Sequence, residues 1–228
     1  MNENVKNVRD KWNEFVEDKY FPCVAAKTAA FRQQMKVMVV GYMGCPKDDA
    51  QILDFIYSFT DEYRSNPELF QSAVILFEQP TIISESLYDT FFWQRLQGLE
   101  RLDRVNYGTD PRVDADPTSP NFSFSIKEEA FFLIGLHPAS SRPSRRFSSP
   151  AIVFNPHAQF EQLRNNSQYA KMKNVIRKRD TAFSGSINQM LDDFGDASEV
   201  FQYTGQQLDK DWQCPLNNTY GNERHKSA

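Results

Sequence analysis

Residues 129–161 read EAFFLIGLHPASSRPSRRFSSPAIVFNPHAQFE and contain two short apolar runs, Ala130–Leu136 and Ala151–Phe154. Each run is too short for a globular helix, is rich in β-branched or aromatic residues and is stopped by a proline, so each is predicted to be a buried strand. A histidine in a proline-containing turn follows each strand, His137 after the first and His157 after the second. Because ligands often bind where strands end, this stretch is the first candidate for a functional site.

The loop that joins the two predicted strands is basic and rich in hydroxyl groups. It reads SSRPSRR over residues 140–146, with arginines at Arg142, Arg145 and Arg146. A guanidinium pairs bidentately with a carboxylate, so these arginines are candidates for binding an acidic group. The plain alternative is that the histidines cap the strands and the arginines form a solvated loop, and spacing alone does not decide between the two.

Length and composition describe an ordinary globular protein. The chain has 228 residues, of which 40% are hydrophobic and 25% charged, and this length allows one large domain or two small ones. The net charge of −4 and the absence of a long basic run argue against duplex nucleic acid or an anionic membrane as the main partner. The 19 Phe suit a core built around a flat apolar ligand, and they suit a plain Phe-rich core equally well.

The cellular location is predicted from the termini, the apolar runs and the cysteines. No apolar run is long enough to cross a bilayer, and Met1 is followed by polar and charged residues, so we expect neither a membrane span nor a secretory signal. The three cysteines, Cys23, Cys45 and Cys214, form no CxxC pair. An odd cysteine count predicts reduced thiols and a cytoplasmic protein rather than a disulfide framework.

Helices and strands alternate along the first half of the chain. Amphipathic helices are predicted over residues 3–20, 48–66 and 84–104, the second capped by Asp48 and the third by Ser84, with strands at 35–42 and 72–77. Residues 106–121 are predicted to be a loop, either an active-site flap or a connector.

A strand at 122–126 is predicted to pair with Ala130–Leu136 and so to make the sheet mixed. Helices are then predicted from Phe160, around Met172 and over 187–194. The expected fold class is therefore α/β (mixed α+β), a mixed β-sheet flanked by helices in a single domain over residues 1–216, with a polar tail at 217–228.

The sequence lacks the motifs of several common catalytic and nucleotide-binding sites. The chain contains no GxSxG, no P-loop and no GxGxxG. His137 and His157 are too far apart in sequence to argue a zinc site. By residue type alone, His137, His157 and either Glu161 or Glu128 could form a non-haem iron site of two histidines and one carboxylate.

A haem site fits the residues better. It requires an axial ligand, an apolar slot and cations for two propionates. The ligand candidates are Cys23, His137 and His157, and the propionate candidates are Arg142, Arg145 and Arg146. Each thiol has the alternative of being a small buried apolar group.

Six blocks, in order along the chain, carry a resemblance to a known family. They are Phe21-Pro22-Cys23; Gly135-Leu136-His137-Pro138 with Ser141-Arg142; Arg145-Arg146-Phe147; Phe154-Asn155-Pro156-His157-Ala158-Gln159-Phe160-Glu161; Ile176-Arg177-Lys178-Arg179-Asp180; and Trp212-Gln213-Cys214-Pro215. Together they resemble the YqcI/YcgG family over residues 15–216. Family members that have been given a role look like haem-dependent N-oxygenases, which hydroxylate nitrogen in guanidine, amine or aminoimidazole substrates.

The resemblance implies haem b as cofactor, a small nitrogenous substrate, arginine-like for example, and an external electron donor such as a ferredoxin or a flavin reductase. A homodimer is left open. As axial ligand we expect Cys23, then His157, then His137, since Cys23 precedes the small residues Ala25, Ala26 and Ala29, against which a flat macrocycle could lie. A cationic substrate needs an anionic partner, for which the candidates are Glu128, Glu161 and Glu199.

Two departures from the family pattern bear on the substrate. After Tyr203-Thr204-Gly205 this chain has Gln206, where the family has an arginine. This chain also has Asn188-Gln189-Met190, where the family has Asn-Pro-Met. The chain is therefore expected to take a different substrate, or none. Two rival functions follow: a haem-binding sensor or carrier without turnover, and a structural or interaction protein whose basic loop contacts a partner and which binds no haem.

Overall fold

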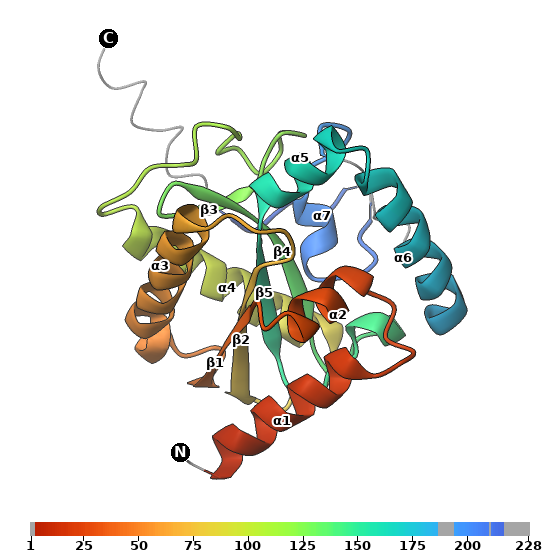
Figure 1. Cartoon of the computed structure of the whole chain (residues 1–228). Helices are drawn as coiled ribbons and strands as arrows, with labels where there is room; N and C mark the ends of the chain where they lie inside the picture. Colours follow the sequence, from red (N-terminus) through yellow and green to blue (C-terminus); the bar gives the residue numbers. More distant parts are fainter. Residues whose placement is uncertain (1–2, 187–193, 210, 217–228) are drawn as a thin grey trace.

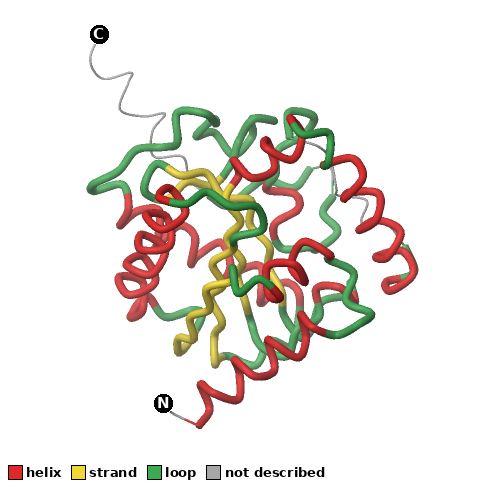
Figure 2. Tube along the Cα trace, viewed as in Figure 1, coloured by secondary structure: helices red, strands yellow, loops and turns green. Residues whose placement is uncertain are grey.

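A five-stranded mixed sheet with the order β1-β2-β5-β4-β3 forms the centre of the computed structural model, which describes residues 3–186, 194–209 and 211–216 (Figure 1; Figure 2). β1 and β2 are parallel, and the other neighbouring strands are antiparallel. The strands are β1 (Met35–Tyr42), β2 (Ser72–Gln79), β3 (Phe124–Ile126), β4 (Glu129–Leu136) and β5 (Ala151–Pro156).

Helices cover both faces of this sheet. Those in the described residues are α1 (Glu3–Glu17), α2 (Val24–Phe31), α3 (Asp49–Ser65), α4 (Glu85–Asp103), α5 (His157–Asn165), α6 (Tyr169–Ser184) and α7 (Val200–Tyr203), together with the 3-10 turns η1 (Pro46–Asp48) and η2 (Pro143–Arg145). None of the described helices is both long and apolar enough to span a membrane. The predicted single domain with a mixed sheet and flanking helices is confirmed.

The central strand β2 is buried on both sides because each face of the sheet carries its own core. Alternate side chains of a strand point to opposite faces. Ile75 and Phe77 therefore pack with α3 and α4, whereas Val74 and Leu76 pack with α1. A continuous apolar run, rather than an alternating one, is what such a doubly covered strand requires.

The short strand β3 leaves part of β4 unpaired on its outer edge. β3 pairs only with residues 129–131 of β4, and α7 packs beside the rest of that strand. Arg145 joins the two, because its guanidinium donates to the carbonyl oxygens of Gly135 in β4 and of Gln202 and Tyr203 in α7. A Cβ at Gly135 would lie 2.5 Å from the Tyr88 hydroxyl oxygen, so this close approach requires glycine.

Three local predictions need correction. The Asp48 side chain does not cap α3, since its carboxylate instead accepts a hydrogen bond from the backbone N–H of Gly41 at 3.0 Å. The strand predicted over 122–126 covers only Phe124–Ile126. His157 lies not in a turn but at the first residue of α5, which follows β5 directly. The helix predicted over 187–194 falls almost wholly outside the described residues, as do Asn188-Gln189-Met190 and the tail at 217–228.

Candidate functional site

A cavity of about 270 Å³ lies between one face of the sheet and the helices α1, α2, α5 and α6. Its floor is the face of β4 and β5 that carries Phe132, Ile134, Val153 and Asn155. The period of two along β5 continues through residues 153 and 155 to His157, which therefore reaches the same cavity. The walls are mainly apolar and aromatic, as in most small-molecule sites.

Cys23 enters this cavity from the start of α2. Its Sγ caps the helix by accepting a hydrogen bond from the Ala26 N–H at 3.4 Å, and the side chain is half-buried. Burial raises the pKa of this thiol, while the backbone N–H groups of Ala26 and Ala25 act in the opposite direction. Ala25 and Ala26 also line the cavity, as expected for small residues beside a ligand, whereas Ala29 is buried outside it.

His157 and Glu199 meet at the cavity wall. Nδ1 of His157 lies 3.3 Å from Oε1 of Glu199, and both side chains are buried. Neither ring nitrogen of His157 makes a hydrogen bond of good geometry with any described residue. Oε2 of Glu199 accepts hydrogen bonds from Ser123 Oγ at 2.9 Å and from the Tyr203 hydroxyl at 3.3 Å. A buried imidazole with two unused nitrogens is available to a ligand in the cavity.

His137 lies at the opposite end of the sheet from His157. β4 and β5 are antiparallel, with Leu136 paired to Ala151 at one end and Phe131 to Pro156 at the other. About 17 Å of ladder therefore separates the two ends, at ~3.4 Å per residue. The two histidines cannot share a metal ion, so the non-haem iron triad is not assembled. The described residues also contain no group of three His, Cys, Asp or Glu side chains suited to a metal.

The surroundings of His137 are those of a core residue. Its ring stacks on Tyr88 with the ring centres 4.2 Å apart, and it does not line the cavity. Burial lowers the pKa of His137 to about 4. The imidazole is therefore neutral at physiological pH.

The three arginines of the basic loop have separate places. Arg142 lines the cavity and forms an ion pair with Asp180 of α6. Arg145 also lines the cavity but is 8% exposed and is held by three carbonyl groups, and burial lowers its pKa to about 10. Arg146 is exposed, lies outside the cavity wall and donates to the carbonyl oxygens of Ser140 and Ser141. Only two of the three expected propionate partners are therefore near the cavity.

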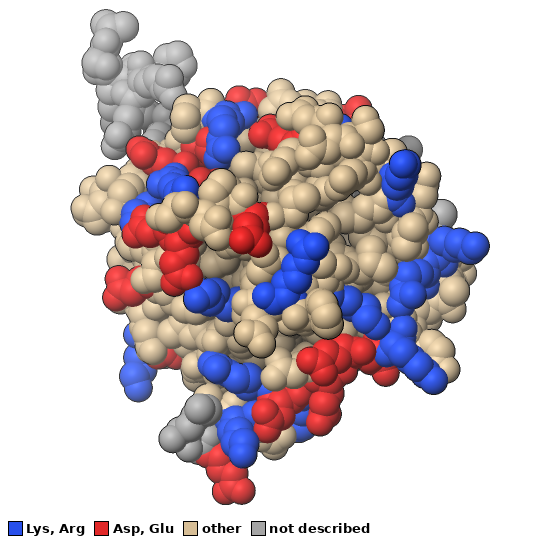
Figure 3. Space-filling view, in the orientation of Figure 1, with Lys and Arg blue, Asp and Glu red and all other residues tan. Residues whose placement is uncertain are grey.

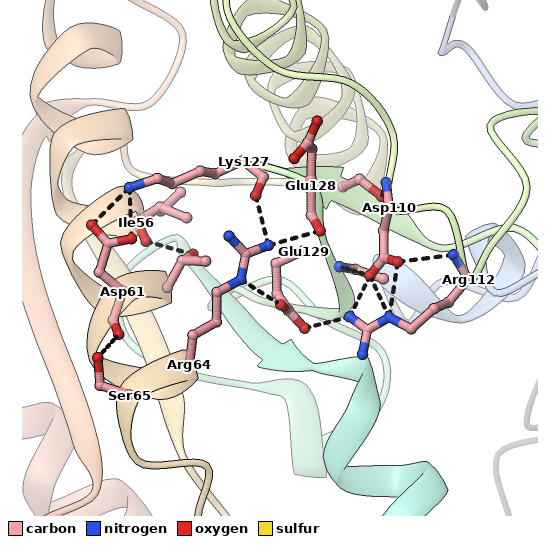
Figure 4. A network of polar contacts seen from close by, with 12 residues as sticks. Ile56, Asp61, Arg64, Ser65, Asp110, Arg112, Lys127, Glu128 and Glu129 are labelled. Carbon is pink, nitrogen blue, oxygen red and sulfur yellow. Dashed lines mark hydrogen bonds and ion pairs between the residues drawn. The ribbon is translucent and has the colours of Figure 1, made fainter.

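Of the three acidic candidates, the structure brings only Glu199 to the cavity. Glu161 is one helical turn from His157, with Oε1 3.9 Å from Nε2, but it does not line the cavity. Glu128 is exposed in the β3–β4 turn, where its carbonyl oxygen accepts a hydrogen bond from Arg64 (Figure 4). The neighbouring ion pairs join Arg64 and Arg112 to Glu129, and none of these three residues lines the cavity. The loop 106–121 contributes no cavity residue either, which removes the expectation of a flap over this site.

Helix α6 supplies a wall of the cavity that the sequence did not indicate. Met172 and Ile176 line the cavity, and Asp180 is the only buried residue of this helix. Basic side chains gather over α6, whereas α1 carries both acidic and basic ones (Figure 3). The apolar residues of α6 at spacing i, i+4 read as ordinary core positions, so no local signal marks them as a cavity wall.

The sequence model of the YqcI/YcgG family matches residues 12–217. The chain belongs to the YqcI/YcgG family. No curated protein and no solved structure matches the chain. The matched range includes Cys23, His157 and Glu199, so every polar group of the cavity described above lies within the family domain of this YqcI/YcgG protein.

The cavity residues of this YqcI/YcgG protein include the types of side chain that a haem group would need. A flat apolar macrocycle needs apolar walls, which Phe132 and Ile134 on the sheet and Ile176 on α6 provide. It also needs an axial donor, and Cys23 and His157 are both at the cavity, the imidazole without a hydrogen-bond partner among the described residues. Cationic side chains also line the wall, namely Arg142, Arg145, Arg164, Lys173 and Arg177, although Arg142 pairs with Asp180 and Arg145 is held by three carbonyl groups.

Proposed function

We propose that this YqcI/YcgG protein binds haem b in the cavity and hydroxylates a nitrogen of a small guanidine-, amine- or aminoimidazole-type substrate. The observation that carries the proposal is that three groups line one mainly apolar cavity: the thiol of Cys23, the buried imidazole of His157 and the buried carboxylate of Glu199. We also propose a cytoplasmic location, because all three cysteines are free thiols.

Cys23 and His157 are the residues that would hold the iron. Haem supplies the activation of dioxygen that hydroxylation of nitrogen requires. The Ala26 N–H hydrogen bond to the Cys23 sulfur stabilises negative charge on that atom, as a thiolate ligand needs. Glu199 lies beside Nδ1 of His157 and can favour the tautomer in which Nδ1 carries the hydrogen. Nε2 is then the ring nitrogen that would bind iron.

Glu199 is the proposed partner of a cationic substrate nitrogen. A carboxylate in an apolar wall binds a guanidinium or ammonium group more strongly than an exposed one, because water screens it less. Ser123 fixes Oε2 of this carboxylate, so Oε1 is the oxygen that faces His157. The electrons come from an external donor such as a ferredoxin or a flavin reductase, since the sequence carries no flavin or iron–sulfur motif.

The proposal is tested by hemin titration followed by a product assay. Purified protein is expected to bind hemin stoichiometrically, with a saturable Soret band. With dioxygen and a ferredoxin and its reductase, it is then expected to convert L-arginine, a primary alkylamine or 2-aminoimidazole to an N-hydroxy product detected by mass spectrometry. A protein that binds no hemin in this titration would overturn the proposal.

A haem sensor or carrier without turnover is the second candidate, favoured by one observation. Cys23 and His157 line the same cavity, so the chain offers two possible axial donors, and iron held by both would have no open position. A six-coordinate, low-spin spectrum in both oxidation states, together with no product from any of the three probes, would select this reading over the enzyme.

A further inference from the structure

A row of oxidisable aromatic side chains leads from the cavity wall to the protein surface. Tyr203 of α7 lies behind the wall, with its ring centre 6.0 Å from that of Phe132, which lines the cavity. Trp93 of α4 follows, 6.3 Å from Tyr203, and Trp212 lies 5.7 Å from Trp93. Tyr203 and Trp93 are buried and Trp212 is half-buried, so the row begins beside the cavity and ends at the surface.

Each inner member of the row has a carboxylate at its acidic hydrogen. The Tyr203 hydroxyl donates to Oε2 of Glu199 at 3.3 Å. The indole Nε1–H of Trp93 donates to Oδ1 of Asp89 at 2.9 Å. A phenol that loses an electron becomes a strong acid and must pass on its proton, so an adjacent carboxylate makes its oxidation easier. The acceptors are thus placed where one-electron oxidation needs them.

We propose that Tyr203, Trp93 and Trp212 form a path that carries oxidising equivalents out of the cavity when no substrate consumes them. The inference rests on the proposed function, since the oxidant is hydrogen peroxide activated by haem in the cavity. The O–H bond of Tyr203 breaks, its electron reduces the oxidant by one equivalent, and its proton passes to Glu199. An electron from Trp93 and the returning proton then restore Tyr203. Trp212 reduces oxidised Trp93, and ascorbate in solution finally reduces Trp212.

Tyr88 provides the matched control for this path. Like Tyr203 it is fully buried, and its ring also lies near Phe92. Its hydroxyl, however, donates to the carbonyl oxygen of Ala151 at 2.7 Å, and an amide carbonyl does not take up the proton. Trp12 is the competing first donor of electrons, because it lines the cavity, but its Nε1–H donates to the sulfur of Met35 rather than to a carboxylate.

The test is peroxide treatment of hemin-loaded protein without substrate, read in two ways. Freeze-quenched samples are examined by electron paramagnetic resonance, and oxidised residues are located by peptide mass spectrometry. Wild-type protein is expected to give protein-centred radicals and oxidation products at Trp93 and Trp212. Tyr203→Phe is expected to lower the radical yield and oxidation at both tryptophans several-fold and to bleach the haem faster. Trp212→Phe is expected to prolong the radical on the inner residues, and Tyr88→Phe to behave as wild type.

This experiment distinguishes failure of the proposed path from failure of the proposed function. Hemin uptake with equal radical yields in wild type and Tyr203→Phe would overturn the path, as would oxidation confined to Trp12. Absence of hemin uptake would overturn the proposed function and the path with it. Since phenylalanine preserves the rings in the core, a folded Tyr203→Phe protein is expected. If that variant does not fold, Trp93→Phe must show the same loss of oxidation at Trp212.

Discussion

Nδ1 of His157 lies 3.3 Å from Oε1 of Glu199, and this contact joins the start of α5 to the start of α7 inside the cavity. The two side chains come from separate segments, and each was a candidate for a different role: His157 as an iron ligand and Glu199 as a substrate partner. Their proximity means that a substrate held by Glu199 would lie beside the proposed metal site.

Glu199→Gln is expected to weaken binding of the cationic substrate while hemin uptake stays near wild type. Glutamine keeps the shape and the acceptor for Ser123 but removes the charge. Hydrogen bonds to charged groups contribute about 1.5–3 kcal/mol, so KM for whichever of the three probes is hydroxylated should rise roughly 10- to 100-fold. Glu128→Gln, at an exposed position outside the cavity, is the matched control. Equal KM values in the two variants would rule out the role of Glu199.

Arg145→Lys is expected to destabilise the fold, and Arg146→Lys to leave it almost unchanged. The buried guanidinium of Arg145 serves three carbonyl oxygens at once, which an ammonium group cannot reproduce. The expected loss in free energy of unfolding is about 2 kcal/mol, against less than ~0.5 kcal/mol at the exposed Arg146. Urea unfolding of the haem-free protein measures both, and equal midpoints would contradict the structural role of Arg145.

Asp103 is expected to make stability depend on pH in the acidic range. Burial raises its pKa to about 6, so between the ordinary aspartate pKa and this value the folded protein binds more protons than the unfolded chain. The free energy of unfolding should therefore fall as pH rises through that window. Asp103→Asn removes this contribution, and the wild type should lose about 2 kcal/mol relative to the variant between about pH 4 and about pH 7. Urea unfolding measures this, and the same difference in free energy of unfolding between wild type and variant at both pH values would contradict the prediction.

Hemin is expected to slow amide hydrogen exchange in α6 more than in α4. α6 has only Asp180 buried, and Met172 and Ile176 face the cavity, so a bound ligand would complete its packing. α4 is packed in the core on the other face of the sheet and serves as the internal reference. Hydrogen exchange with mass spectrometry, with and without hemin, measures the difference. Protection spread equally over both helices would show that the ligand does not contact α6.

Sequence patterns predicted β1, β2, β4 and β5 well because each is a short apolar run with a proline or glycine at or just after its end, whereas β3 is shorter than predicted. The Ser84 cap of α4 was also predictable, and its hydroxyl accepts from the Leu87 N–H at 3.1 Å. Asp48 has the same local pattern, but a tertiary contact with Gly41 takes its carboxylate instead. Local propensity decides such cases only where no distant group competes.

The site was predicted only in part, because pairing direction is not a local property. His137 and His157 each follow a strand, but the antiparallel register of β4 and β5 sends them to opposite ends. Likewise, nothing near Arg145 indicates that it is buried under α7. The alternation along β5 does contain a usable signal, since the polar Asn155 occupies a face that Val153 and His157 share in the cavity.

We propose that the cavity holds haem with Cys23 or His157 as axial ligand. The most direct test is the absorption spectrum of hemin-loaded protein after reduction under carbon monoxide, for the wild type, Cys23→Ala and His157→Ala. A strongly red-shifted carbon monoxide band that Cys23→Ala abolishes identifies a thiolate ligand, and a globin-like band that His157→Ala abolishes identifies the imidazole. A wild-type protein that forms no haem complex, or spectra that neither substitution alters, would contradict the account.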